Sequence, residues 1–361
     1  MRQLDKSYLE ENRRELELTK NISLTMLNPL ALIELRETGK CYVSLPEELF
    51  DLDFQGHYFR RIKSVSLSMP CVVGPNTSVS CSLRLLKNTY RVNTLLNSGD
   101  QYEHANHDVL GIDDDRFRGS NVPVTSIAIS RGQNDAGMFE FSFRDERYLP
   151  FERAGVISDW LIELSTEKEL RQFDYATISD VILHLNYTAK ESVRLKEPAV
   201  RYIKDFIINT ANLADQPMMR MFSMKHEFPT EWHNFLHPAA EGAEQILSFN
   251  VGKERFPFFT QGSDIVVMKI EAFAKCTLTG DYHMVLYRDS VASSQITMPQ
   301  NDTYGGLNKA TINDGDAGLD LKELDITEKF SLKVKHHTAS DYTGLATEPG
   351  EVEDIFLVIH Y

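Results

Sequence analysis

The sequence has no hydrophobic run long enough to cross a membrane. A spanning helix needs about 20 consecutive apolar residues, and every apolar run in the 361 residues is much shorter. The first residues, MRQLDKSYLEENRRELELTK, carry charges throughout and lack the apolar core of a secretory signal. These absences exclude direct membrane insertion by this chain, and they predict that export would need another route or a larger chain.

Cysteine is also scarce, with four residues: Cys41, Cys71, Cys81 and Cys276. None has the paired CxxC spacing of a zinc site. Cys71 and Cys81 flank a Gly-Pro-Asn turn, so a disulfide between two strands is conceivable. Free, half-buried thiols are the favoured prediction, because a chain of this length does not need covalent staples.

Basic residues are fewer than acidic residues. The chain has 38 Lys and Arg residues against 53 Asp and Glu residues, a formal net charge of −15. Such a surface repels phosphate backbones and anionic lipid, which argues against nucleic-acid binding. The GxSxG, P-loop, HExxH and dinucleotide-binding motifs are all missing as well. We therefore predict a protein that is not an enzyme and that needs no cofactor.

One polar segment, QYEHANHD, places three potential metal ligands close together: His104, His107 and Asp108. A metal bound there would suit a metal-dependent hydrolase. The segment is loop-like and polar, so solvated histidines are the favoured interpretation, and we predict no metal.

The first forty residues favour helix. Neither Gly nor Pro interrupts residues 6–26, and strong helix formers dominate. Five apolar residues form two neighbouring stripes on this predicted helix and make its predicted oligomer face: Leu9, Leu16, Leu18, Ile22 and Met26. Two stripes fit a helix between neighbours in a bundle, or an ordinary helix packed on its own domain. Asn28 is expected to cap a second helix that begins at Pro29, and Gly39 to end it in a left-handed conformation.

After Gly39 the hydrophobic period changes to two, which is typical of strands with one buried face. Short alternating runs separated by turns continue to residue 187 and resume near residue 220, with a short helix predicted over 198–209. Residues 293–320 are rich in Gly, Asn and Asp, which predicts a long mobile loop. Many short strands with turns between them favour antiparallel sandwiches over a parallel sheet.

An internal echo suggests two copies of one unit. Residues 180–187, DVILHLNY, and 354–361, DIFLVIHY, share the pattern Asp-Φ-x-Leu-x-Φ-x-Tyr. The stretches LFDLDFQGHYFRRIKSVSLS and ERFPFFTQGSDIVVMKIEAF are loosely similar too. Alternating strands imitate each other easily, so duplication and coincidence both remain open. The predicted fold is mainly β, with a helical segment at 1–39, antiparallel β-sandwiches at 40–190 and 215–361, and a helical connector at 191–214.

Large aromatic residues gather near turns in the second half of the chain: Phe256, Phe258, Phe259 and Trp232. They fit protein contacts or sugar platforms if exposed, or plugs at the ends of a sandwich core if buried. Burial is the favoured interpretation. The exposed alternative makes a carbohydrate-binding module the main rival function.

Several long stretches resemble the A component of bacterial Tc toxin complexes. They are YLEENRRELELTKNISL, LNPLALIELRETGKC and LPEELFDLDFQGHYFRRIKSVSLSMPCV, followed by residues 132–151, residues 171–187 and HEFPTEW at 226–232. The resemblance is densest from 8 to 188 and thinnest from about 277 to 335.

This resemblance implies a domain that binds the B component of the complex. In that family the A component is a secreted homopentamer around a channel, and its C-terminal domains form a collar on which the β-propeller face of the B–C cocoon docks. The leading segment would then be the end of a channel helix. As contacts for the B component we predict loops at the sandwich ends: Asp113, Asp114, Asp115, Asn301, Tyr304, Asp314 and Asp316.

Overall fold

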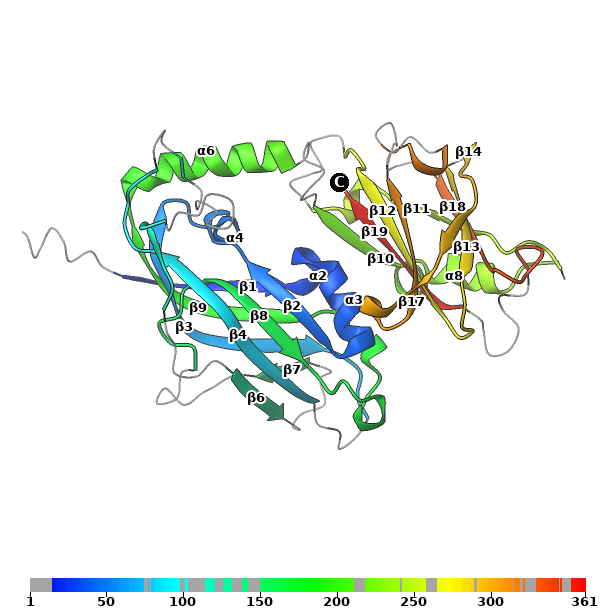
Figure 1. Ribbon diagram of the computed structural model, residues 1–361, viewed down its shortest axis with the longest axis horizontal. Coiled ribbons are helices and arrows are strands. Elements are labelled where there is room, and N and C mark those ends of the chain that lie inside the picture. The colour runs from blue at the N-terminus through cyan, green and yellow to red at the C-terminus, as the bar shows by residue number, and fades with distance from the viewer. Residues whose placement is uncertain are drawn as a thin grey trace, which may run out of the picture. The chain divides into compact units, whose positions relative to one another are not determined.

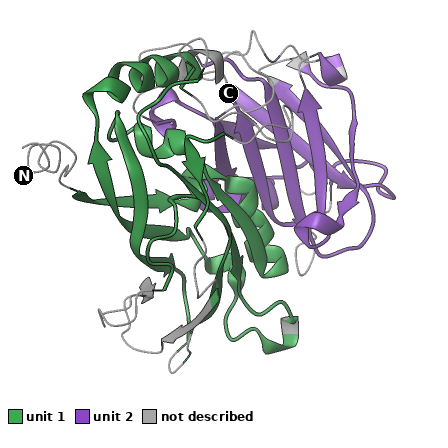
Figure 2. Cartoon of the chain, turned by 60° about the vertical axis from the view of Figure 1, so that its left-hand side comes forward, with its two compact units in different colours: residues 1–209 green, residues 210–361 purple. Residues whose placement is uncertain are grey.

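The computed structural model describes residues 15–361, apart from 75–76, 78, 98–100, 103–113, 121–125, 132–137, 142–149, 211–217, 241, 258–264, 289–290, 314, 319–320, 322–328, 344 and 346–351. The chain divides into two compact units, residues 1–209 and 210–361, which Figure 2 shows in separate colours. Each unit contains two antiparallel sheets.

The sheets of the first unit are both built from strands distant in sequence (Figure 1). One has the order β1-β9-β3-β7, from β1 (Leu16–Ser23), β9 (Ile182–Glu191), β3 (His57–Pro70) and β7 (Met138–Phe141). The other has the order β2-β8-β4-β5, with β6 also on β4, from β2 (Lys40–Leu45), β8 (Ile157–Glu163), β4 (Val79–Arg91), β5 (Phe117–Arg118) and β6 (Ser126–Arg131).

The core of the first unit follows from strict alternation along these strands. In β2, Cys41, Val43 and Leu45 are buried and the residues between them are exposed. In β9, Leu183 and Leu185 are likewise buried. One face of each sheet is therefore apolar, and burying it is the main stabilising term of the unit.

The predicted helix boundaries at Asn28, Pro29 and Gly39 are confirmed. Helix α3 (Pro29–Thr38) starts with proline in its first turn, and the Asn28 side chain accepts a hydrogen bond from the Ala31 N–H. Gly39 ends the helix with φ of 84°, a conformation that glycine adopts without a Cβ clash. The other helices of this unit are α2 (Leu24–Leu27), α4 (Glu47–Asp51) and α6 (Val193–Thr210), with short 3-10 turns at Lys168–Leu170 and Tyr175–Thr177.

The predicted helix over 6–26 is wrong for residues 16–23, although Leu24–Leu27 do form the short helix α2. Residues Leu16–Ser23 form strand β1, which pairs antiparallel with β9 from Leu16 opposite Ala189 to Ser23 opposite Ile182. Burial along β1 alternates, with Ile22 buried and Leu16 and Leu18 half-buried. The apolar residues stand at even spacings, so a strand lays them on one face, and pairing with β9 overrides helix propensity.

The second unit also has two sheets. One has the order β10-β19-β12-β17-β16, from β10 (Met219–Ser223), β19 (Val352–His360), β12 (Lys269–Cys276), β17 (Leu307–Asn313) and β16 (Gln300–Asn301). The other has the order β11-β18-β13-β14, with β15 also on β13, from β11 (Leu247–Asn250), β18 (Lys329–His336), β13 (Tyr282–Arg288), β14 (Val291–Ala292) and β15 (Ile296–Met298).

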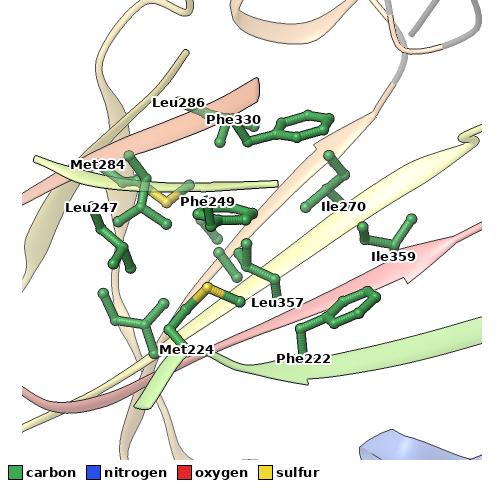
Figure 3. Close-up of a cluster of buried hydrophobic side chains, with 14 of the residues drawn as sticks. Phe222, Met224, Leu247, Phe249, Ile270, Met284, Leu286, Phe330, Leu357 and Ile359 are labelled. Atoms are coloured by element: carbon green, nitrogen blue, oxygen red, sulfur yellow. The ribbon is translucent and has the colours of Figure 1, made fainter. Parts of the chain in front are cut away.

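Helices cover one end of this second sandwich, and its core lies between the sheets. The helices are α7 (Met224–Glu227) and α8 (Pro229–Leu236), with 3-10 turns at Lys253–Arg255, Asp302–Tyr304 and Asp316–Gly318. Figure 3 shows Phe222, Ile270 and Leu357 of one sheet and Phe249, Met284 and Phe330 of the other pointing into the shared interior.

The prediction of a mobile loop over 293–320 is wrong for its described residues. Strand β17 lies inside this range and pairs with β12 over six residues, from Asn308 opposite Ala274 to Asn313 opposite Lys269. Leu307, Ala310 and Ile312 are buried. Asn308 is buried as well, and its side-chain amide donates to the Met298 carbonyl at 2.9 Å. Polar residues therefore serve as strand residues here, because their side chains find internal partners.

The four thiols are free as predicted, but the predicted half-burial holds only for Cys276. All four cysteines are free, three of them buried and Cys276 half-buried. Burial raises the pKa of Cys71 to about 11 and that of Cys81 to about 12, so these thiols stay protonated and unreactive near neutral pH. Among the described helices, none combines the length and the hydropathy that crossing a bilayer requires.

Candidate partner-binding end of the first unit

A buried cluster of charges lies at one end of the first sandwich. Arg91 of β4 holds Glu47 of α4 through two hydrogen bonds, Nε to Oε1 at 3.0 Å and Nη2 to Oε2 at 2.7 Å. Arg60 of β3 donates to Asp51, and the Tyr102 hydroxyl donates to the other Asp51 oxygen at 2.8 Å. Asp51 is fully buried, and Arg60 and Arg91 are 3% and 1% exposed. We call these five residues the ion cluster.

The local sequence explains how the ion cluster assembles. Glu47 and Asp51 stand four residues apart on one short helix, so both carboxylates lie on the same helical face. Arg60 and Arg91 come from separate strands whose ends meet at this helix. Two aromatic rings also contact the Arg91 guanidinium, with centroids at 4.3 Å for Tyr102 and 4.4 Å for Phe117, and both interactions are of the cation–π type.

The ion cluster fixes the backbone of the neighbouring surface segments. Arg60 donates to the Phe54 carbonyl at 2.9 Å, just after α4. Arg91 donates to the Tyr102 carbonyl at 2.7 Å, and Arg116 donates to the Gln101 carbonyl at 2.9 Å. Residues 47–54, 101–102 and 114–118 are therefore tied to one rigid base. We call these three segments together the pinned end.

Burial governs the electrostatics of the ion cluster. It raises the pKa of Asp51 to about 6, even though the adjacent Arg60 guanidinium pulls that pKa down. For Arg60 and Arg91 burial alone would lower the pKa, but the two carboxylates outweigh it and both pKa values are raised. Both arginines are thus charged at every accessible pH. Burial also raises the pKa of the Tyr102 hydroxyl, which stays a donor.

Of the predicted acidic contact residues of the first unit, Asp114 and Asp115 are described and differ in burial. The Asp114 carboxylate binds the Arg116 guanidinium at 2.5 and 2.8 Å and is only 5% exposed. Asp115 is exposed. Asp113 lies outside the described residues, as do His104, His107 and Asp108. In the described part of the chain no three His, Cys, Asp or Glu side chains are grouped so that they could hold a metal.

The other predicted contact residues lie in the second unit. Asn301 is on the edge strand β16 and caps the following 3-10 turn by accepting from the Thr303 N–H at 3.0 Å. Tyr304 meets the ring of Phe273 edge to face at a centroid distance of 4.9 Å. Asp316 accepts hydrogen bonds from Asn313. Asp314 lies outside the described residues.

The predicted oligomer face does not exist as a helical stripe. Leu16, Leu18 and Ile22 lie on strand β1, and Met26, in the separate helix α2, is 58% exposed. Leu9 lies outside the described residues.

The aromatic residues of the second half are core residues where they are described. Trp232 is 6% exposed and Phe256 is 4% exposed, and both belong to the core of the second unit. Trp232 is therefore not an exposed sugar platform, which removes the main residue on which a carbohydrate-binding site would depend. Phe258 and Phe259 lie outside the described residues.

Sequence comparison places the first unit in a known family. Residues 1–189 match the Tc toxin complex TcA C-terminal TcB-binding domain. The toxin subunit YenA2 of Yersinia entomophaga is 36% identical over 190 residues, which are 52% of this chain and 13% of YenA2.

Two solved structures align with a similar share of this chain, at low similarity. The cryo-EM structure of Yersinia pseudotuberculosis TcaA-TcaB covers 53% of this chain and 10% of its own, with 23% identity and a TM-score of 0.31. That of Morganella morganii TcdA4 covers 52% and 8%, with 20% identity and a TM-score of 0.31. The chain thus spans a small part of these much longer proteins. Since the family match covers more than half of the chain, the chain belongs to the TcA C-terminal TcB-binding domain family.

Proposed function

We propose that this chain docks the B component of a Tc toxin, TcB, and that the pinned end of the first unit is the surface that TcB contacts. The observation that carries the proposal is the family match over residues 1–189, which contains every residue of the ion cluster. The role is one of binding rather than catalysis.

The pinned end and its surroundings have the make-up of a protein contact. Leu52 is 49% exposed and Phe54 is 37% exposed directly after α4, and Leu95 is 52% exposed between β4 and Tyr102. Asp53, which pairs with Lys20 at 2.7 Å, and Asp115 are exposed acidic residues of the pinned end. Apolar anchors on a fixed backbone lose little conformational entropy on binding, so more of their contact energy appears as affinity.

The ion cluster stabilises the end of the sandwich less than apolar residues would, which supports a role beyond folding. Burying charges carries a desolvation cost that apolar residues of similar volume avoid. Buried nitrogens of the two arginines, Nε and Nη1 of Arg60 and Nη1 of Arg91, have no hydrogen-bond partner in this structure. Such an arrangement is expected where the positions of surface segments matter more than stability.

The wider assembly follows from the family by analogy. The chain would be presented as a homopentamer within a secreted A component, where five copies form a collar above the translocation channel. Asp113 and Asp115 of the first unit, and Asn301, Tyr304, Asp314 and Asp316 of the second, remain proposed as additional contacts. Five weak contacts presented together gain greatly in avidity.

The test mixes the chain, fused to a pentameric scaffold, with a purified B–C complex and follows the assembly by size-exclusion chromatography with mass detection. We expect a stable complex at micromolar concentration. The same scaffold fused to an unrelated β-sandwich is the control. If the pentameric chain elutes apart from the B–C complex, as the control does, the docking function is wrong.

A further inference from the structure

The second unit repeats the strand order of the first. The order β1-β9-β3-β7 in one unit corresponds to β10-β19-β12-β17 in the other, and β2-β8-β4-β5 corresponds to β11-β18-β13-β14. Each first strand is followed by two short helices, α2 and α3 or α7 and α8, before the next strand. Chance similarity between alternating strands does not explain a shared order across two sheets and two helices.

A serine–aspartate staple occurs at the same place in both units. Ser23 donates to Asp180 at 2.5 Å, and that carboxylate also accepts from the backbone N–H two residues after the serine, at 2.9 Å. Ser223 donates to Asp354 at 2.8 Å, and the corresponding N–H lies at 3.1 Å. Each aspartate begins the Asp-Φ-x-Leu-x-Φ-x-Tyr motif, and each serine precedes a helix-starting proline by six residues.

An aromatic pair marks the other end of the same motif. The closing Tyr187 of the first unit meets Phe50 edge to face at 5.5 Å and 81°. The closing Tyr361 of the second unit meets Phe256 at 4.9 Å and 84°. Phe50 and Phe256 both lie in the connection between the second and third strands, five residues before a Gln-Gly pair. The loose echo in the sequence is therefore a true structural repeat.

The end that carries the ion cluster in the first unit is built differently in the second. There the connection from β11 to β12 contributes the apolar core residues Phe256 and Val267. Beside it, Arg220 and Arg255 share one carboxylate, that of Glu227, at 3.0 and 3.5 Å. Their side chains are 21% and 34% exposed, so two half-exposed guanidinium groups share the Glu227 carboxylate here.

We propose that residues 210–361 are a second, divergent copy of the TcB-binding fold and a second docking module, whose Arg220–Arg255 end binds an acidic patch on the B component. This inference rests on the proposed function of the first unit. Two modules of one fold in one chain, with different chemistry at the equivalent end, would contact two patches on the same partner. Guanidinium groups suit this role, because their planar donors bind carboxylates in pairs.

The test is hydrogen–deuterium exchange of the full pentamerised chain, alone and with the B–C complex. We expect slower exchange on binding in residues 47–54 of the first unit and also in residues 250–256 of the second. If only residues 47–54 are protected, the second unit does not contact the B component, while docking by the first unit still stands. If neither segment is protected and chromatography shows no complex, the chain does not bind the B–C complex. The proposed function itself is then wrong.

A charge reversal then separates docking from a merely structural role. Arg255→Glu should weaken binding of the B–C complex by about tenfold and abolish protection of 250–256 while that of 47–54 persists. Lys275→Glu is the matched control, because it also breaks one ion pair, with Glu353 at 3.8 Å, but at the far end of β12. Equal affinities for these two variants, with both folded by circular dichroism, would contradict the proposal.

Discussion

Arg91 shows most clearly how one residue can hold a surface in place. It joins Glu47, the Tyr102 carbonyl and two aromatic rings, and it is 1% exposed. Replacing Arg91 with Met gives a side chain of similar length but removes both hydrogen bonds to the buried Glu47, whose remaining ion-pair partner is Arg60 at 3.7 Å. We expect this variant to lose about 3–5 kcal/mol of the unfolding free energy of the first unit.

The effect of Arg91→Met on the unfolding free energy can be measured for the first unit alone. The chain has two tryptophans, Trp160 in the first unit and Trp232 in the second, so a Trp232→Phe background lets urea unfolding be followed through Trp160 alone. Arg84→Met on the same strand is the control, because Arg84 is exposed and should change stability by less than about 0.5 kcal/mol. Similar losses for both variants would show that the ion cluster has no special role.

Asp51 gives the stability of the first unit a definite pH dependence. Its pKa is about 6 in the folded chain and about 3.8 in an exposed chain, so folding strengthens its hold on a proton. The stabilisation that protonated Asp51 gives to the folded state is therefore complete below pH 3.8. It is lost as the pH rises to about 6. We expect the unfolding free energy of the wild type, relative to Asp51→Asn, to fall by roughly 1–3 kcal/mol between pH 4 and pH 7.

The comparison with Asp51→Asn isolates this carboxyl group, because the other titrating residues are common to both proteins. The amide oxygen can still accept from Arg60, and the amide NH2 can donate to the Tyr102 hydroxyl oxygen, so the variant should fold. A difference between the two proteins that is constant over this pH range would mean that Asp51 titrates normally.

At the residue scale, the sequence predicts local features and misses the ion cluster. Asn28, Pro29 and Gly39 act through neighbours within four residues, so their roles can be read directly. Glu47 and Arg91 are 44 residues apart in the chain and meet through two different elements. A sequence shows that such residues are charged, but their pairing depends on sheet topology.

At the element scale, β1 shows how tertiary pairing decides between two local structures. The segment LELTKNIS contains good helix formers, yet its apolar residues alternate, and the edge of β9 offers eight paired positions. The same reasoning applies to β17, whose polar composition suggested a loop. In both segments the pairing of a neighbouring strand outweighs the local preference for helix or loop.

Truncation tests the strand assignment of β1. Removing residues 1–14 leaves β1 intact and should cost the first unit much less unfolding free energy than removing β1 as well. Removing residues 1–23 uncovers β9 and deletes the buried Ile22 with the half-buried Leu16 and Leu18, which should cost about 3 kcal/mol or more. Urea unfolding read through Trp160 compares the two. Equal losses for both truncations would contradict the strand.

At the scale of the whole molecule, the repeat explains why the family match ends at residue 189 while the fold continues. The mainly β, two-sandwich class could be predicted because alternation and turns recur throughout the chain. The equivalence of the two units could only be suspected, since their shared motif is short. It becomes clear once Asp180 and Asp354 are seen to make the same hydrogen bonds.

The proposed contact between TcB and the pinned end of the first unit can be measured directly. The direct measurement is the affinity of the pentamerised chain for a B–C complex, by biolayer interferometry, for Leu52→Asp and for Leu86→Asp. Both leucines are 49% exposed, but Leu86 lies on β4 away from the pinned end. We predict that Leu52→Asp weakens binding by about tenfold or more while Leu86→Asp binds like the wild type. Unchanged binding by Leu52→Asp, or an equal loss in both variants, would mean that TcB does not bind at the pinned end.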